Sequence, residues 1–378
     1  MSAWPEIDFR DLVSDETGGN TKTLQSDYLP AGKFPIVDQG QSLIGGYTND
    51  AARVCRAELP VIIFGDHTKC FKFIDFPFCL GADGTKVLRP KQAVDERYLY
   101  YALQRIHIPD AGYSRHFKYL KEGKIPLPAI EEQKRIAAIL DQADELFRKR
   151  QRSIARLNQL SQAIFQEMFE AELSSLDRTA LGELVEEFRY GTSNKASEGG
   201  GHPTLRIPNV VGGCIDATDL KFVPLSDAEF NRLRLVDGDV LFVRTNGNPD
   251  YVGRSAVFTL AKANAFGAEE SGWAYASYLI RARPNPKLLN SWFLQAYLSH
   301  PQGKRALKER SKTSAGQFNI NTEGLGSIPM PKVHIERQME FEKAITSLDP
   351  VISSLSVADR CFETLFRSLQ HRAFRGEL

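Results

Sequence analysis

Two long stretches of the chain repeat apolar residues in alternating steps of four and three. The first begins near Glu131 and is interrupted only at Arg150 and Ser161; its apolar positions are Ile136, Leu140, Ala143, Phe147, Ile154, Leu157, Ile164 and Met168. The second is interrupted at Asp359; its apolar positions are Phe341, Ile345, Leu348, Ile352, Leu355, Phe362, Phe366, Leu369 and Ala373. This heptad pattern predicts two long helices that pack along a seam. The first would be about 60 Å long, and Pro350 should kink or divide the second.

The chain is internally duplicated. Ile125-Pro-Leu-Pro128 recurs as Ile328-Pro-Met-Pro331, and Gln133 then matches Gln338 after two extra residues. The second copy ends with Leu173 matched to Leu378. A weaker echo lies upstream, where Leu88-Arg89-Pro90 and Tyr98-Leu99 match Ala282-Arg283-Pro284 and Trp292-Phe293. Each copy therefore consists of a globular part, an I-P-x-P turn and a helix.

The globular parts alternate short β-rich runs with helical segments. Val61–Phe64 and Asp239–Val243 are typical of strands, and Glu96–Arg105 and Leu289–Leu298 of helices. The predicted fold class is α+β: two mixed α/β domains, each followed by a long helix, with the helices paired as an antiparallel coiled coil. The predicted boundaries are 1–125, 126–173, 174–328 and 329–378. The alternative is that each helix packs only on its own domain.

Composition leaves the function open. The chain is 42% hydrophobic and 25% charged, with a formal net charge of +1, as in ordinary globular proteins. Five scattered cysteines without a C-x-x-C pair predict reduced thiols in a cytoplasmic protein. No apolar stretch approaches the roughly 18 residues that span a bilayer. A net charge near zero still permits nucleic-acid binding, which requires only a local basic surface.

Catalytic motifs are broken or absent, so no catalytic residue and no metal site are predicted. Asn248-Pro-Asp-Tyr251 lacks the second proline of the N-P-P-[YF] methyltransferase motif. Pro109-Asp110 with Glu122-Gly-Lys124 fits the spacing of metal-dependent nucleases, but the second copy has Leu325-Gly-Ser327 at the corresponding place. Gln302-Gly-Lys-Arg305 lacks the Ser/Thr of a phosphate-binding loop.

Polar, basic and aromatic loops occupy matching places in both copies. Tyr113–Tyr119 and Lys312–Asn319 precede the two I-P-x-P turns, and Gly65–Lys69 and Arg244–Asn248 follow predicted strands. Such residues donate to phosphates and base edges, although each loop alone is also typical of a solvated turn. The candidate DNA-binding residues are Lys22, His67, Thr68, Lys69, Tyr113, Ser114, Arg115, His116, Lys118, Arg189, Tyr190, Lys195, Arg206, Arg244, Asn246, Asn248, Lys312, Thr313, Ser314, Gln317 and Asn319.

This organisation resembles the specificity subunit of type I restriction-modification systems. The resemblance covers the whole chain and is clearest at Ile125–Ile136 (IPLPAIEEQKRI) and Arg372–Leu378 (RAFRGEL). It implies that each globular domain is a target recognition domain that reads one half of a bipartite DNA site. It also implies that the paired helices separate these domains and bind two adenine-specific methyltransferase subunits, to which restriction (translocase-nuclease) subunits are added.

The resemblance implies no cofactor in this chain, because S-adenosylmethionine, Mg²⁺ and ATP would belong to the partner subunits. Pro350 and the two-residue insertion before Gln338 depart from a regular second helix. Two other functions stay open. A Mg²⁺-dependent nuclease would cleave DNA as an isolated chain, whereas a coiled-coil protein adaptor would show no salt-dependent binding to duplex DNA.

Overall fold

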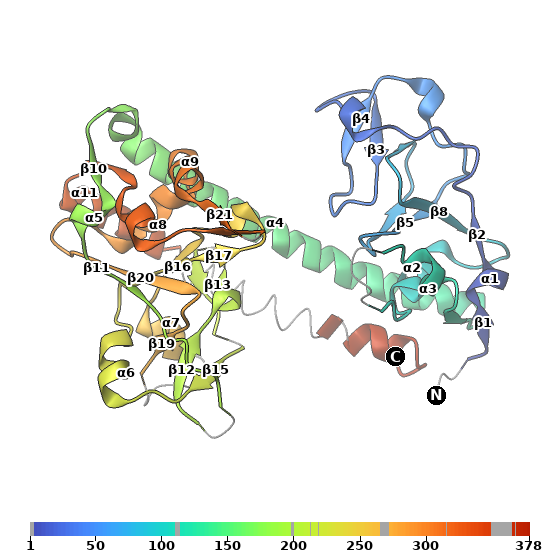
Figure 1. Cartoon of the computed structure of the whole chain (residues 1–378). Helices are drawn as coiled ribbons and strands as arrows, with labels where there is room; N and C mark the ends of the chain where they lie inside the picture. Colours follow the sequence, from blue (N-terminus) through green and yellow to red (C-terminus); the bar gives the residue numbers. More distant parts are fainter. Residues whose placement is uncertain are drawn as a thin grey trace. The chain divides into compact units, whose positions relative to one another are not determined.

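The computed structural model describes residues 4–109, 114–197, 200–211, 213–217, 219–264, 272–314, 316–348, 365–366 and 368–378 (Figure 1). The chain forms two compact units: Met1–Arg152 with Ser356–Leu378 is unit 1, and Ser153–Leu355 is unit 2. The predicted domain boundaries at residues 125 and 328 stay a prediction, because the units divide the chain within its helical segments.

Unit 1 is built on a four-stranded antiparallel sheet in the order β2-β8-β5-β6. Its strands are β2 (Val13–Asp15), β5 (Val61–Gly65), β6 (Phe71–Ile74) and β8 (Thr85–Pro90). Strand β5 is apolar throughout because both of its faces are buried. Ile62 and Phe64 join the core beneath the helices, whereas Val61 and Ile63 join a second core on the opposite face. The strand predicted at Val61–Phe64 is confirmed.

Smaller elements complete unit 1. A three-stranded sheet has the order β4-β3-β7, with β3 parallel to β7, and β1 pairs with β9. These elements and the helices of the unit are β1 (Glu6–Asp8), α1 (Phe9–Leu12), β3 (Phe34–Val37), β4 (Gly46–Thr48), β7 (Cys79–Leu80), α2 (Glu96–Gln104), α3 (Phe117–Leu120) and β9 (Lys124–Pro126). Helix α2 confirms the helix predicted from Glu96.

Unit 2 repeats this topology strand for strand. Its sheets have the orders β11-β20-β16-β18, β15-β12-β19 and β10-β23, again with one parallel pair, β12 with β19. The elements that correspond to those of unit 1 are β10 (Arg178–Ala180), α5 (Leu181–Leu184), β11 (Val185–Tyr190), β12 (His202–Leu205), β15 (Lys221–Val223), β16 (Val240–Val243), β18 (Ser255–Val257), β19 (Ala274–Tyr275), β20 (Leu279–Pro284), α8 (Ser291–Ser299), α10 (Thr322–Gly326) and β23 (Pro329–Pro331). The duplication predicted from the sequence therefore extends to the fold.

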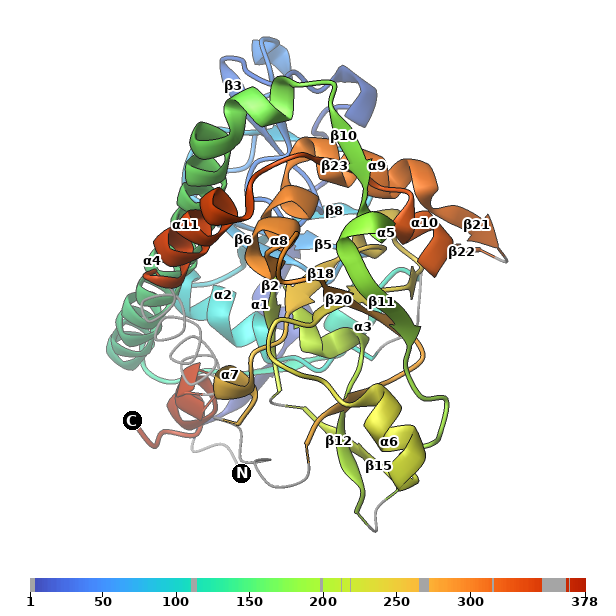
Figure 2. The same cartoon turned by 90° about the vertical axis from the view of Figure 1, so that its left-hand side faces the viewer.

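Other elements distinguish unit 2. They are β13 (Val210–Val211), β14 (Cys214–Ile215), α6 (Asp227–Leu233), β17 (Thr245–Asn246), α7 (Leu260–Asn264), α9 (Pro301–Arg310), β21 (Lys312–Ser314) and β22 (Gln317–Asn319). Figure 2 shows the β21–β22 hairpin at the edge of unit 2, beside α10. Helix α9 and this hairpin lie between α8 and α10; in unit 1, the described residues of the corresponding segment, between α2 and α3, form no helix or strand.

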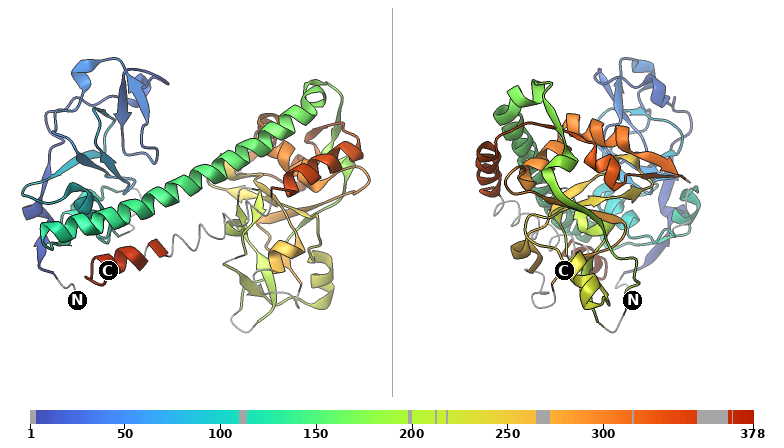
Figure 3. Two further views of the ribbon diagram at one scale, coloured as in Figure 1. Left: turned by 180° about the vertical axis from the view of Figure 1, so that it is seen from behind. Right: turned by 60° about the vertical axis from the view of Figure 1, so that its left-hand side comes forward.

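Helix α4 (Ile130–Ser174) supplies the long helix predicted from Glu131, and Figure 3 shows its course. In unit 1 its first turns bury Ile136 and Leu140 in a core shared with Phe374, and Phe366 and Leu369 pack against that core. In unit 2 its last turns pack on α11 (Ile335–Thr346), where Phe341 lies 5.4 Å from Phe165 between ring centroids. These contacts pair the first turns of α4 with the end of the chain and its last turns with α11, so the predicted antiparallel pairing is confirmed.

The predicted seam drifts along α4. Phe147, Ile154 and Leu157 are half-buried, and Ile164 and Met168 only pack against the core, whereas Phe165 and Phe169 are fully buried. A helix with 3.6 residues per turn drifts about 20° per heptad, and four heptads separate Ile136 from Ile164. Over four heptads this rotation adds up to about 80°, which is nearly the 100° between neighbouring residues of a helix. The buried position therefore moves by one residue, from Ile164 to Phe165. The seam residues Ile352, Leu355 and Phe362, with Pro350, lie outside the described residues.

A buried glutamine connects each globular part to its helix. In unit 1 the Gln133 side chain accepts from the Asp95 amide (3.0 Å) and donates to the Pro128 carbonyl (2.8 Å). In unit 2 the Gln338 side chain accepts from the Asn290 amide at 2.8 Å. Asp95 and Asn290 are the N-caps of α2 and α8, which shows that the match of Tyr98 to Trp292 is wrong by one residue. The strands match at a shift of 194 and the helices at 195.

Among the described residues, no helix is long and apolar enough to cross a membrane.

Candidate nucleic-acid interface

In unit 2, two predicted loops that lie far apart in the sequence form one small sheet. Strand β17 pairs with β22, which pairs with β21, so that Thr245 lies opposite Asn319 and Ser314 opposite Gln317. The Thr245 hydroxyl donates to Oε1 of Gln317 at 3.1 Å. We call this three-stranded sheet the reading sheet. It brings the candidates on Arg244–Asn248 and Lys312–Asn319 onto a single surface.

The side chains of the reading sheet are accessible and polar. Lys312, Thr313 and Gln317 are exposed, whereas Asn246 and Asn319 are half-buried. Asn246 and Asn248 accept hydrogen bonds from the amides of Asn248 (2.9 Å) and Asp250 (3.0 Å), which orders the loop that follows β17. Ser314 lies in β21 opposite Gln317. Within this sheet β21 and β22 form a two-stranded hairpin, and the major groove of B-DNA admits a two-stranded ribbon.

A cation-aromatic cluster adjoins the reading sheet. The Arg244 guanidinium stacks over the Tyr190 ring at 4.8 Å, and the Tyr190 hydroxyl accepts from the Thr322 amide at 3.3 Å. The Arg244 amide donates to the Tyr278 carbonyl at 2.9 Å, and the Tyr278 side chain is 59% exposed. Sequence analysis did not identify Tyr278. An exposed tyrosine between two strands was the only signal that could have indicated it.

The corresponding loops also meet in unit 1. The Asp66 carbonyl, directly after β5, accepts from the His116 amide at 2.8 Å, and Oδ1 of Asp66 accepts from the Phe117 amide at 2.7 Å. In unit 2 the Arg244 carbonyl, directly after β16, accepts from the Ile320 amide at 2.9 Å. Both units therefore join the loop after their central strand to the segment before the I-P-x-P turn.

The structure corrects the prediction for His116. Its side chain is 1% exposed, and its Nδ1 lies 2.9 Å from the Asp66 carbonyl oxygen, so it organises the loop and is not available to DNA. Arg115 and Lys118 are exposed on either side of it. Ser114 is half-buried, and Tyr113 lies outside the described residues.

The turn after β5 is held by a residue that sequence analysis missed. The Gln39 side chain accepts from the His67 amide at 3.2 Å, and the Gln39 carbonyl accepts from the Thr68 hydroxyl at 2.5 Å. Lys69 has a φ of 60°, in the left-handed region, where its amide donates to the Gly65 carbonyl at 2.8 Å. His67 and Lys69 are half-buried and Thr68 is exposed, so this turn is a narrower surface than the reading sheet.

Three predicted cations are already paired with carboxylates. Lys22 contacts Asp83 at 2.5 Å, Arg206 contacts Asp219 at 2.8 Å, and Arg189 pairs with Glu187. The hydrogen bond from Arg189 is the largest influence that holds the pKa of Glu187 below its ordinary value. Glu187 also pairs with Arg281, which is 1% exposed, so Arg189 belongs to an internal network. Lys195, by contrast, is exposed.

The nuclease alternative gains little from the structure. Pro109, Glu122 and Lys124 line a cavity of about 430 Å³ in unit 1, and Asp110 lies outside the described residues. The described part of the chain contains no group of three or more His, Cys, Asp or Glu side chains that could hold a metal ion.

Comparison with known proteins gives a consistent result. The family described as Type I restriction modification DNA specificity domain matches residues 3–159. The type I restriction enzyme EcoKI specificity subunit of Escherichia coli K12 is 28% identical over 324 residues, covering 77% of this chain and 68% of the relative. The MjaVIII specificity subunit of Methanocaldococcus jannaschii is 26% identical over 374 residues, covering 90% and 82%.

A solved structure supports the fold. The crystal structure of the type I restriction-modification S subunit from M. genitalium covers 99% of this chain and 96% of its own, with a TM-score of 0.53 and 18% identity. Both curated relatives are named as specificity subunits of restriction enzymes. These names agree with the expectation of a recognition subunit that is not itself an enzyme.

Proposed function

We propose that the chain is a specificity subunit of a type I restriction-modification system and reads a bipartite DNA target, with one half-site for each unit. The observation that carries this proposal is the repeated junction between the loop after the central strand and the segment before the I-P-x-P turn. This junction, at Asp66 with His116 and at Arg244 with Ile320, places polar and basic candidates together in both units. Two similar surfaces in one chain suit two half-sites.

The reading sheet is the proposed base-reading element of unit 2. The major groove of B-DNA admits a two-stranded ribbon, and each base pair presents a distinct pattern of donors and acceptors there. Lys312 and Arg244 can donate to guanine, and Gln317 and Asn319 carry the amide groups that pair with adenine. In unit 1, Arg115, Lys118 and Thr68 are the exposed candidates at the junction, whereas the exposed Lys22 is paired with Asp83.

We further propose that the paired helices recruit two methyltransferase subunits and set the spacing between half-sites. Restriction subunits then join this assembly. S-adenosylmethionine, Mg²⁺ and ATP are assigned to those partners and none to this chain. Leu146 and Leu160, which are 59% and 45% exposed on α4, are apolar positions that a partner subunit could cover.

Methylation sequencing tests the recognition proposal. The chain is co-expressed with its methyltransferase subunit, and the methylated adenines of the host genome give the target sequence. Lys312→Ala and Gln317→Ala should each relax one position of one half-site, at about 1–3 kcal/mol of discrimination, and leave the other half-site unchanged. Arg115→Ala should act only on the opposite half-site, or weaken binding to all sequences if Arg115 contacts phosphate.

Lys287 provides a matched control for Lys312. It is exposed in unit 2, but it follows the end of β20 that is distant from Tyr278 and the reading sheet. Lys287→Ala should leave the target unchanged. If Lys312→Ala, Gln317→Ala and Arg115→Ala all methylate the unaltered target with unaltered affinity, the reading surface is elsewhere. If the chain binds no duplex DNA, the adaptor alternative becomes the better account.

A further inference from the structure

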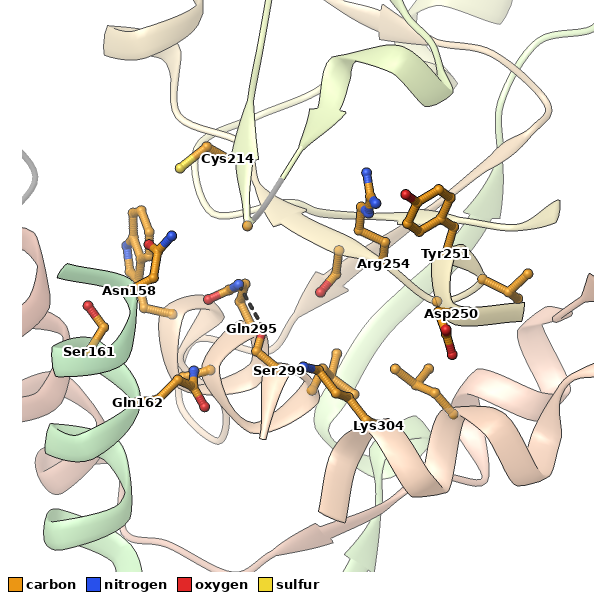
Figure 4. Close-up of a pocket in the computed structure, with 18 of the residues that line it drawn as sticks. Asn158, Ser161, Gln162, Cys214, Asp250, Tyr251, Arg254, Gln295, Ser299 and Lys304 are labelled. Carbon is orange, nitrogen blue, oxygen red and sulfur yellow. Dashed lines mark hydrogen bonds between the residues drawn. The ribbon is translucent and has the colours of Figure 1, made fainter. Parts of the chain in front are cut away.

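A second basic surface of unit 2 lies beside the reading sheet and contains none of the predicted residues. Four cations, Arg254, Lys304, Arg305 and Lys308, line a cavity of about 820 Å³, and Asp250 is the single carboxylate residue among its lining residues. Figure 4 shows Lys304 extending from α9 and Arg254 from the loop that follows Pro249–Tyr251. We call these four residues the α9 cluster.

The packing of α9 explains why its basic side chains are exposed. A Cβ atom at Gly303 would lie 2.1 Å from the Tyr297 carbonyl oxygen, so only glycine lets α9 approach α8 this closely. The Gln302 side chain donates to the Leu173 carbonyl at 3.0 Å, and Ala306 and Leu307 are buried. Lys304, Arg305 and Lys308 are exposed on α9, as is Glu309, which pairs with Arg310 at 3.7 Å. In the Gln302-Gly-Lys-Arg305 motif, Gln302 and Gly303 therefore hold α9 against its neighbours, and Lys304 and Arg305 are the exposed cations.

A second glycine places Arg254 next to this face. Gly253 has a φ of +78°, and a Cβ atom there would lie 2.6 Å from Cδ2 of Leu307 on α9. The loop can therefore lie directly against α9. The Arg254 guanidinium stacks over the Tyr251 ring at 4.1 Å, which holds it beside the helix.

The α9 cluster has no neutralising partner among the described residues. Ion pairs engage Lys22, Arg189 and Arg206, but none is formed by Arg254, Lys304, Arg305 or Lys308 in the described ranges. Four cations that form no ion pair with another described residue, gathered around one cavity, attract a ligand with several negative charges. The cavity also presents Asn158, Gln162, Gln295 and Ser299, and amide and hydroxyl groups of this kind contact phosphates and sugars in protein–DNA complexes.

Chain continuity connects the α9 cluster to the reading sheet and so favours DNA as its ligand. Helix α9 ends at Arg310 and β21 begins at Lys312, while β17 ends at Asn246 and leads through Pro249–Tyr251 to Arg254. The same two segments therefore carry the reading sheet and the α9 cluster. Helix α9 is about 15 Å long at 1.5 Å per residue, and duplex DNA carries one charge per 1.7 Å or so of its axis. Several phosphates would lie within reach of α9.

We propose that the α9 cluster binds the phosphodiester backbone of DNA next to the bases that the reading sheet contacts. This inference rests on the proposed function and adds to it the anchor that sets the register of unit 2 on the duplex. Phosphate contacts carry no sequence information, so the α9 cluster contributes affinity and the reading sheet contributes specificity.

Salt titration tests this anchor without knowledge of the target. The probe is a fluorescent 40-base-pair duplex of random sequence, titrated with the full chain assembled with its methyltransferase subunits at several salt concentrations. The combined variant Lys304→Ala, Arg305→Ala, Lys308→Ala should lower the slope of log K against log salt by about three units, one for each contact. Lys287→Ala should match the unsubstituted chain, and Asp250→Asn should tighten binding, by up to about fivefold.

The outcomes separate this inference from the proposed function. If the unsubstituted assembly binds the random duplex but the combined variant has the same slope, the α9 cluster does not contact phosphate and the inference is overturned. The inference is also overturned if the combined variant binds DNA normally but no longer assembles with the methyltransferase subunits. In that case the α9 cluster contacts an acidic surface of a partner subunit. If the unsubstituted assembly itself binds no duplex, the proposed function fails first. Unchanged circular dichroism is expected because all three side chains are exposed.

Discussion

The amide of Gln338 should stabilise unit 2 more than the amide of Gln133 stabilises unit 1. Gln338 is 1% exposed and makes three hydrogen bonds: from the Asn290 amide (2.8 Å), and to the carbonyls of Val333 (2.8 Å) and Leu288 (3.1 Å). Gln133, 2% exposed, makes two. The perturbation is Gln→Met, which nearly conserves volume and removes only the polar atoms.

The expected magnitude follows from the number of hydrogen bonds. Removing one partner of a buried hydrogen bond and leaving the other unpaired costs about 1 kcal/mol at the low end of the usual range. Gln338→Met should therefore destabilise unit 2 by about 3 kcal/mol, and Gln133→Met should destabilise unit 1 by about 2 kcal/mol. For a urea m-value of about 2 kcal/mol/M, the urea concentration at the midpoint of unfolding of unit 2 would fall by roughly 1.5 M.

Fluorescence and hydrogen exchange measure the two effects separately. Trp273 and Trp292 lie in unit 2, and Trp292 is two residues from the N-cap Asn290, so urea unfolding followed by tryptophan emission reports mainly on this unit. Hydrogen exchange of peptides that contain Asp95 or Asn290 reports locally on the hydrogen bonds that these residues form with Gln133 and Gln338. Gln159→Met, at an exposed position of α4, is the matched control. The reasoning is refuted if Gln338→Met is no more destabilising than Gln159→Met, or if Gln133→Met has the larger effect.

Three further predictions concern spacing, pH and catalysis. Inserting four residues after Gln151 should add about 6 Å to α4 and lengthen the recognised spacer by one or two base pairs; an unchanged spacer in a folded, active protein would show that α4 is not the ruler. Burial lowers the pKa of His300, which caps α9 by accepting from the Gln302 amide. The thermal stability of the protein should therefore decline as the pH falls below about 6.5, and His300→Asn should reduce that decline. Equal pH profiles of stability for the two proteins would contradict this. The purified chain should show no nuclease, methyltransferase or ATPase turnover with Mg²⁺, ATP and S-adenosylmethionine, and activity lost in Asp110→Ala or Glu122→Ala would support the nuclease alternative.

The sign of the pH effect follows from the neutral imidazole. Nδ1 of His300 must be unprotonated to accept from the Gln302 amide, and the other ring nitrogen lies 2.9 Å from Oε1 of Gln166. Because the folded pKa lies below the unfolded one, the stabilisation is complete above the unfolded pKa and is lost as the pH falls through the folded value. Asparagine preserves an N-cap acceptor without titrating.

Local and repeated features of this fold could be predicted from the sequence. The runs at Val61–Phe64 and Val240–Val243 are apolar because each central strand is buried on both faces, and the duplicated I-P-x-P turns identified the two copies. The phase of α4 could not be predicted beyond a few heptads. Ile164 and Phe165 are adjacent apolar residues, and only the packing with Phe341 determines which of them is buried.

The candidate site depended on non-local pairing, which residue types alone do not specify. The loops at Arg244–Asn248 and Lys312–Asn319 were identified, but their union in one sheet requires a register across some 70 residues. His116 has a polar side chain in a basic loop, and nothing in its neighbourhood indicated the bond to the Asp66 carbonyl that buries it. The α9 cluster was missed because Lys304 and Arg305 belong to a motif that was considered only as a phosphate-binding loop.

The additional strands of unit 2 have a consequence for the orientation of bound DNA. Two-fold symmetric proteins read palindromes, because their two surfaces are the same. Here the topology is duplicated, but α9, β21 and β22 lie between α8 and α10 of unit 2 and have no counterpart among the described residues between α2 and α3 of unit 1. A target read by two such unequal surfaces has a direction: the inverted sequence presents each half-site to the wrong unit. The protein would then bind each target in one orientation only, and so distinguish the left of its site from the right.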